Sequence, residues 1–229
     1  SWMLLSGYPA SDPSYSYTKV LVKNGSTTDY SSSARTLTAT NVSPSTSVGY
    51  PPIVKTGSSG SVGQVWYVDT GTNNYLGFGG SLADFSFSQT AWTLEFWAYI
   101  PSGSSSYLHS FVVGGQSGGG VVKAYGGDGN YYIYSSAGSS ASLATGYRNQ
   151  WFWVVFERYN GVISAWVNGA NRVQSSSMPT GGTPGSAGLG LPFNTEYVPH
   201  YLDEVRWSTT ARYQGAASIP VQAYSWPER

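Results

Sequence analysis

The sequence predicts an all-β fold, a two-sheet antiparallel sandwich, on three observations. Helical periodicity is nearly absent, because Gly (29) and Pro (12) are spread along the chain and no window longer than about ten residues keeps apolar residues at helical spacing. Short runs of β-branched and aromatic residues recur instead, bounded by Gly, Ser, Asn and Pro. With 229 residues, 40% of them hydrophobic, the chain is long enough to form one large sandwich domain.

At least seven runs are predicted to be strands. They are residues 19–22, 64–68, 92–100, 130–134, 151–158, 162–168 and 201–207. In residues 92–100 large apolar side chains alternate with others, which predicts that Trp92, Leu94 and Phe96 share one face. Residues 151–156 include no polar side chain, so this strand is expected to be central and buried on both faces. The turn at Asn160-Gly161 predicts a hairpin with residues 162–168.

Segments rich in Ser and Gly are expected to be loops between these strands. They are residues 31–33, 102–106, 116–120 and 175–190. They are too short to be linkers between domains, and no internal repeat is evident.

Charge and cysteine content exclude several classes of function. Charged residues make up only 10% of the chain, and 11 basic side chains balance 11 acidic ones. Nucleic-acid binding and membrane-surface binding are therefore not expected, because both need clustered Lys and Arg. No apolar run is long enough to span a bilayer. The absence of Cys favours a large core, or folding in a reducing cytoplasm, over a disulfide framework, and residues 1–5 lack the basic flank of a signal peptide.

Four motifs, in this order, resemble the laminin G-like branch of the concanavalin A-like lectin/glucanase superfamily. They are Thr93–Trp97 (TLEFW), Trp153–Arg158 (WVVFER), Trp166–Gly169 (WVNG) and Leu202–Arg206 (LDEVR). The resemblance implies an all-β, two-sheet antiparallel jelly-roll sandwich. Each motif alone is weak, and the four together are more specific for fold than for function.

The opening and the ending are similar to jelly-roll domains common in bacteriophage virion proteins. The opening is Val20–Gly25, and the ending is Asp203–Arg206 followed by Ala211–Tyr213. The jelly-roll domain is expected to cover residues 17–219, between an N-terminal arm (1–16) and a C-terminal tail (220–229). Both ends are aromatic and contain Pro, so each is expected to lie on the sandwich or on a neighbour, and we expect them to dock on neighbouring subunits.

The phage resemblance implies a non-enzymatic protein of the virion surface, in capsid decoration or associated with the tail. Its expected partners are other virion proteins, identical subunits and host surface glycans. The alternative is a carbohydrate-binding module or adhesin domain of a secreted, extracellular bacterial protein.

Catalysis is not expected. Glycoside hydrolases of this superfamily place two or three carboxylates along one strand, where acid and nucleophile face the sugar together. Here Glu95 stands alone on its strand. Asp203 and Glu204 are adjacent, so alternation predicts one inward, hydrogen-bonded side chain and one outward side chain. The only two histidines, His109 and His200, lie in no nucleophile motif.

Calcium is the one cofactor that the sequence leaves open, because calcium needs only oxygen ligands. The resemblance implies a site at a loop edge, as related domains often hold one calcium ion there. The candidate ligands are Asp69, Asn73 and Asn74 in one polar loop, and Asp128 in a second. The alternative is that Asp69 and Asn73 hydrogen-bond the backbone of their own turn.

The abundance of aromatic residues is the basis for predicting contacts with glycans or protein partners. The chain has 9 Trp and 19 Tyr, and exposed rings can stack on sugars or fill protein interfaces. Tryptophans inside predicted strands are expected in the core: Trp92, Trp151, Trp153 and Trp166. Tyrosines in predicted loops are the candidate contacts: Tyr107, Tyr125, Tyr147 and Tyr197.

Overall fold

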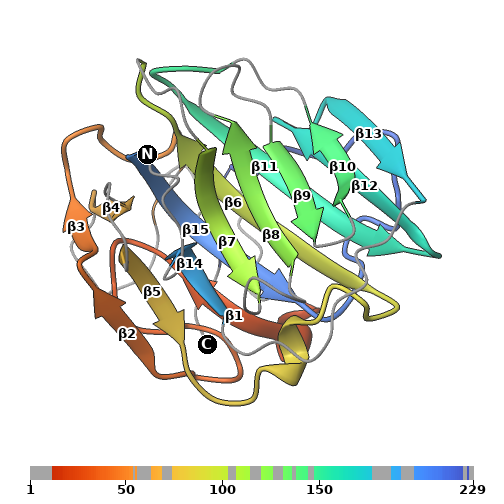
Figure 1. Ribbon diagram of the computed structural model, residues 1–229, viewed down its shortest axis with the longest axis horizontal. Coiled ribbons are helices and arrows are strands. Elements are labelled where there is room, and N and C mark those ends of the chain that lie inside the picture. Colours follow the sequence, from red (N-terminus) through yellow and green to blue (C-terminus); the bar gives the residue numbers. More distant parts are fainter. Residues whose placement is uncertain are drawn as a thin grey trace, which may run out of the picture.

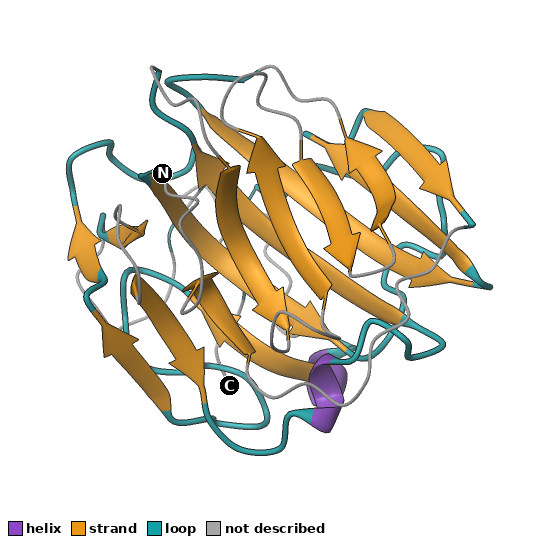
Figure 2. Cartoon of the chain, viewed as in Figure 1, coloured by secondary structure: helices purple, strands orange, loops and turns teal. Residues whose placement is uncertain are grey.

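The computed structural model describes residues 12–53, 55, 63–68, 74–102, 107–113, 120–125, 131–135, 138–143, 147–176, 187–191, 199–223 and 226. This part of the chain consists of strands and loops, with two short 3-10 turns, η1 (Tyr15–Tyr17) and η2 (Ala83–Phe85) (Figure 2). Within it, no helix has the length and apolar character needed to cross a membrane. The predicted all-β class is confirmed.

The strands form two sheets in which every neighbouring pair is antiparallel. The first has eight strands, with β1 (Thr18–Val22) paired to β15 beside the main path of seven. That path runs β13 (Asn171–Ser175), β12 (Val162–Val167), β11 (Trp151–Tyr159), β6 (Trp92–Tyr99), β15 (His200–Ser208), β4 (Val65–Val68), β3 (Ser43–Ser45). The second sheet runs β10 (Gly138–Leu143), β9 (Tyr131–Ser135), β8 (Gly120–Tyr125), β7 (Tyr107–Val113), β14 (Ala187–Leu191), β5 (Asn74–Phe78), β2 (Leu37–Thr40).

The two sheets lie face to face as a sandwich (Figure 1), and the main hydrophobic core fills the space between them. Side chains from both sheets contribute, for example Phe96 and Trp207 from the first and Leu76 and Leu189 from the second. Trp207 stacks on Trp92 with ring centroids 5.2 Å apart. The predicted two-sheet sandwich is therefore confirmed.

A second, smaller cluster lies on the other face of the eight-stranded sheet, which we call its outer face. Trp97, Trp153 and Trp166 project from this face and are nearly or fully buried. They are covered by Ile53 and by the C-terminal segment, which we define as residues 209–223 and 226. The sheet is thus buried on both faces over its centre.

The strongest sequence patterns agree with the structure. In β6, Trp92, Leu94 and Phe96 face the main core, as their alternation predicts. β11 lies between β6 and β12 and is buried on both faces. Asn160 (φ 48°) and Gly161 (φ 77°) form the two-residue turn of the predicted β11–β12 hairpin.

The loop predicted at residues 175–190 is partly wrong, because β14 begins at Ala187 inside it. This strand has the alternating sequence AGLGL and pairs with both β5 and β7. A Cβ atom on Gly188 would lie 2.5 Å from the carbonyl oxygen of Leu76, and one on Gly190 would lie 2.4 Å from that of Asn74. These glycines therefore permit close backbone approach inside a sheet, where a sequence pattern reads them as loop residues.

Candidate functional site

The outer face of the eight-stranded sheet holds the carboxylates that the sequence singled out. Asp203 lies opposite Trp97, but Arg206 lies opposite Glu95, so β15 includes an extra residue at this point. Glu204 takes up the extra residue with a left-handed backbone (φ 50°). The prediction that Asp203 and Glu204 point to opposite faces is wrong, because this bulge breaks the alternation. Both side chains are fully buried and bind the same ammonium group.

That ammonium group belongs to Lys55, which pairs with Asp203 and lies 3.1 Å from Glu204 Oε1. Asp203 Oδ1 also accepts the N–H of Asn24 (2.8 Å), and Glu204 Oε2 accepts the N–H of Trp226 (2.9 Å). Burial raises the pKa of Asp203 to about 6 against the opposing charge of Lys55. Burial acts to lower the pKa of Lys55, but the two carboxylates outweigh it and raise that pKa.

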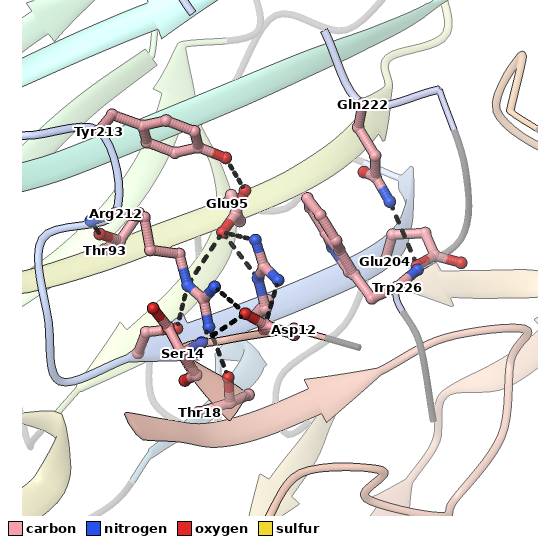
Figure 3. A network of polar contacts seen from close by, with 12 residues as sticks. Asp12, Ser14, Thr18, Thr93, Glu95, Glu204, Arg212, Tyr213, Gln222 and Trp226 are labelled. Atoms are coloured by element: carbon pink, nitrogen blue, oxygen red, sulfur yellow. Dashed lines mark hydrogen bonds and ion pairs between the residues drawn. The ribbon is translucent and has the colours of Figure 1, made fainter. Parts of the chain in front are cut away.

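A second group of charges centres on Glu95 (Figure 3). Glu95 Oε1 lies 2.6 Å from a guanidinium nitrogen of Arg206, and Oε2 accepts the hydroxyl of Tyr213 (2.7 Å). Asp12 pairs with both Arg206 (3.0 Å) and Arg212 (2.9 Å). Burial acts to raise the pKa of Asp12, but the hydrogen bond from Arg212 and the two positive charges outweigh it and lower that pKa.

Glu157 on β11 is the third buried carboxylate centre. It accepts the backbone N–H groups of Tyr213 (2.7 Å) and Gly215 (2.9 Å). Burial raises the pKa of Glu157 despite these hydrogen bonds. Glu95, Glu157 and Glu204 thus each accept a hydrogen bond from the C-terminal segment, and they hold that segment on the outer face.

The described parts of both chain ends contact the chain's own sandwich. Asp12 belongs to the predicted N-terminal arm, and Trp226 belongs to the predicted C-terminal tail. The ring of Trp226 lies over the guanidinium of Arg206, 3.3 Å from the guanidinium carbon to the ring centroid. Lys23 donates a hydrogen bond to the carbonyl of Trp226 (2.8 Å). These contacts add to the cover over the centre of the outer face.

Most of the predicted calcium ligands, Asp69, Asn73 and Asp128, lie outside the described residues. Asn74 is described as the first residue of β5, where it is 8% exposed and shares its face with the core residues Leu76 and Phe78. Within the part of the chain that the structure describes, no three His, Cys, Asp or Glu residues are grouped to hold a metal ion.

The structure describes three of the four predicted tyrosine contacts: Tyr107 and Tyr125 lie in strands and not in loops, whereas Tyr147 lies in a loop, as predicted. Tyr107 begins β7 and Tyr125 ends β8, and the two are directly opposite each other across the strand pair. Tyr147 is partly buried and stacks on Phe152 with centroids 5.5 Å apart, so it packs against the main core. Tyr197 lies outside the described residues.

A feature that the sequence analysis missed is a line of aromatic rings on the outer face, beside the covered centre. We call it the aromatic row, and its members, in order across four strands, are Tyr67 (β4), Tyr201 (β15), Tyr99 (β6) and Trp151 (β11). Each ring is directly opposite the next in the strand register. Successive ring centroids are 4.9, 5.8 and 5.7 Å apart. All four side chains are partly exposed.

The surroundings of the row are neutral and polar. Exposed Ser43 on the edge strand β3 lies opposite Tyr67 and extends the row by one strand. At the other end, Trp151 Nε1 donates a hydrogen bond to the carbonyl of Val48 (3.4 Å). Tyr50, two residues beyond Val48, is 48% exposed. The expectation that Trp151 is a core residue is only partly correct, because its side chain packs against the smaller cluster but remains partly exposed.

The row can offer ring faces and edges, phenolic hydroxyls and serine hydroxyls to a bound molecule. In the described part of this face, the carboxylates are fully buried and hydrogen-bonded or ion-paired. The alternation in residues 92–100 places Tyr99 on the side away from the core. This alternation was the one signal in the sequence that pointed to a member of the aromatic row. The other rings come from distant segments and meet only through the strand register.

Comparison with known proteins finds similarity in structure alone. The sequence matches no family model and no curated protein. The binding domain of Paraclostridial Mosquitocidal Protein 1 is similar over 85% of this chain and 49% of its own, with a TM-score of 0.60 and 12% identity. The receptor-binding domain of botulinum neurotoxin type G is similar over 86% of this chain and 48% of its own, with a TM-score of 0.59 and 11% identity. The chain thus spans about half the length of these proteins and shares their β-sandwich fold.

Proposed function

We propose that this protein is a non-enzymatic binding module that recognises glycans through the aromatic row. The observation that carries the proposal is the alignment of four partly exposed rings across four strands, next to hydroxyl groups and without a charged member. Aromatic rings stack on the apolar faces of sugars, while hydroxyl groups satisfy the polar rims of the same sugars. A rigid sheet holds the rings in place, which keeps the entropic cost of binding low.

Two further observations support a binding role. The structural neighbours are described as binding and receptor-binding domains, which shows that this sandwich fold is used for recognition elsewhere. Among the described residues of the outer face, Glu95, Glu157 and Glu204 are buried as acceptors for the C-terminal segment, and Asp203 is buried in an ion pair with Lys55, which leaves none of these carboxylates free to attack a substrate. Release of reducing sugar from glycans by the pure protein would contradict the non-enzymatic part of the proposal.

We place this module on the surface of a bacteriophage particle, within the laminin G-like, concanavalin A-like superfamily. The support for this setting is the likeness of residues 20–25, 203–206 and 211–213 to jelly-roll domains of virion proteins. Immunogold labelling of intact particles should then decorate their surface. Labelling confined to the cytoplasm of infected cells, or to a secreted bacterial protein, would contradict this location.

The test of glycan binding uses the full chain displayed on beads, because single sugar sites are weak and multivalent display raises avidity. Binding to host cells and to a glycan panel is expected for the natural sequence and is expected to fall at least tenfold in Tyr201→Ala, a loss of about 1.4 kcal/mol in binding free energy. The matched control is Tyr17→Ala, which removes a 51% exposed ring outside the row.

A repeat of the assay with a calcium chelator tests the predicted ligands Asp69, Asn73, Asn74 and Asp128. Loss of binding on chelation would make calcium part of the site. Binding that survives chelation and depends on Tyr201 is the result expected from the row. Failure of the natural sequence to bind any glycan or host cell would overturn the proposed function.

A further inference from the structure

We infer that the aromatic row takes one extended, uncharged polysaccharide chain that lies across the strands, from the edge strand β3 towards β11. This inference rests on the proposed function and names the class of ligand for the same site.

The spacing of the rings sets the first requirement on the ligand. Neighbouring strands lie about 4.8 Å apart, and the row offers one ring per strand, with centroid separations of 4.9 to 5.8 Å. A pyranose residue in an extended chain advances the chain by a similar length. A linear glycan that crosses the strands can therefore place about one sugar over each ring, which a single terminal sugar cannot do.

The tilt of the rings sets the second requirement. Tyr67 and Tyr201 are tilted by 34°, Tyr201 and Tyr99 by 86°, and Tyr99 and Trp151 by 61°. The four rings therefore do not share one plane and do not form one flat platform. A flat crystalline stack of chains cannot contact all four rings at once. A single chain, whose successive sugars can rotate about their linkages, can do so.

Charge sets the third requirement. Among the described residues, the charged side chains that follow the row along β15 are Asp203, two residues after Tyr201, and Glu204, and both pair with Lys55. These groups are buried and satisfy one another, so they offer no free cation to an acidic sugar. An acidic glycan would lose hydration at the row without gaining an ionic contact from these described groups, and a neutral glycan avoids this cost.

The open edge sets the fourth requirement. β3 is the last strand of the sheet on this side, and Ser43 is exposed at the position that extends the row. A chain that follows the row can therefore continue past the edge of the sheet. This geometry favours the interior of a long chain over recognition of its end.

The test measures binding of the full chain to soluble neutral linear polysaccharides (β-glucan, xylan, mannan and dextran) and to acidic ones (alginate, polygalacturonate and hyaluronan). Calorimetry then follows a series from mono- to hexasaccharide cut from the best neutral binder. We expect a preference for neutral chains and affinity that rises at least about tenfold from disaccharide to tetrasaccharide and then levels off. Tyr201→Ala should abolish this rise, while Tyr201→Phe, which keeps the ring, should retain most of it.

The outcomes separate this inference from the proposed function. If acidic glycans bind best, or if a mono- or disaccharide binds as tightly as the tetrasaccharide, and Tyr201→Ala removes that binding, the inference is wrong and the proposed function stands. If glycans bind equally to the natural sequence and to Tyr201→Ala, the row is not the site and both are wrong. Absence of binding to every polysaccharide also contradicts both.

Discussion

Two regions share the outer face of the eight-stranded sheet and differ in what covers them. Over the centre, Glu95, Glu157 and Glu204 are fully buried under the C-terminal segment. At one end of the same strands, Tyr99 and Tyr201 belong to a row that remains partly exposed. The two regions lie within a few residues of each other along β6 and β15.

The difference shows that the two regions have separate roles: the buried charged residues stabilise the fold, and the exposed uncharged residues are available for binding. The ionisable groups of the centre form ion pairs and hydrogen bonds that hold the chain ends, because a buried carboxylate must be paired or hydrogen-bonded. The exposed end holds rings and hydroxyl groups, which can bind a neutral ligand without ionic partners. Removal of a central residue should therefore cost stability, and removal of a row residue should cost binding.

The largest effect is expected for Glu95→Ala. This change leaves Arg206 and Arg212 buried around a single carboxylate, Asp12, and removes the acceptor of the Tyr213 hydroxyl. Breaking one partner of a buried ion pair typically costs about 3–5 kcal/mol. Urea unfolding should show a loss of this order. Glu95→Gln also removes the charge but keeps the shape of the side chain, so it should lose less than Glu95→Ala. A stability close to that of the natural sequence in both variants would contradict the role of the charge.

The next effect is expected for Gly169→Ala, in the turn that receives the C-terminal segment. Its carbonyl accepts the N–H of Ile219, and a Cβ atom here would lie 2.1 Å from the carbonyl oxygen of Ile219. The matched control is Gly161→Ala, which has a similar backbone (φ 77° against 73°) but no atom within 4 Å of the new Cβ. Gly169→Ala should lose about 1–3 kcal/mol more than the control and speed proteolysis of residues 209–226. Equal losses would mean that the segment is not held at this turn.

A smaller effect is expected from pH at Asp203. The pKa of about 6 in the folded protein lies above the ordinary 3.8, so the folded protein keeps a proton that the unfolded chain releases between these values. The free energy of unfolding should therefore fall by about 2 kcal/mol as pH rises from about 4 to about 6. Asp12, whose pKa is lowered, acts in the opposite direction and loses its contribution below about pH 4. Urea unfolding across this range should show a flatter profile in Asp203→Asn, and an unchanged profile would contradict the assignment.

The smallest effect on stability is expected for Tyr67→Ala in the row. Its ring packs on Tyr201 across the strand pair, and such cross-strand aromatic contacts contribute about 0.5–1.5 kcal/mol. The same variant should lose glycan binding on beads while its unfolding curve shifts little. A loss of stability as large as that of Glu95→Ala would show that the row is part of the core.

The sequence predicts the fold where one periodic signal is strong. The alternation from Trp92 to Ile100 and the apolar run from Trp151 to Phe156 identify β6 and β11 and their faces. The prediction from the sequence fails where backbone geometry overrides the pattern of apolar and polar residues. Glycine in residues 187–191 permits close strand pairing, and the left-handed residue Glu204 turns two adjacent carboxylates to the same side.

The candidate site is harder to predict for a different reason. Tyr67, Tyr99, Trp151 and Tyr201 are separated by dozens of residues in the sequence, and only the register of four strands brings their rings together. Composition shows that aromatic residues are abundant, but it does not show which of them share a line. The same limit applies to the tyrosines that were predicted to lie in loops. Tyr107 lies in strand β7, and Tyr147 packs against the main core.

The most direct test of the division between the two regions measures stability and glycan binding together in Glu95→Gln and Tyr201→Ala. We expect the first variant to unfold at lower urea and, while folded, to bind neutral polysaccharide as the natural sequence does. We expect the second to unfold near the natural midpoint and to lose binding at least about tenfold. Loss of binding in folded Glu95→Gln with full binding in Tyr201→Ala would contradict the account and move the binding site to the covered centre.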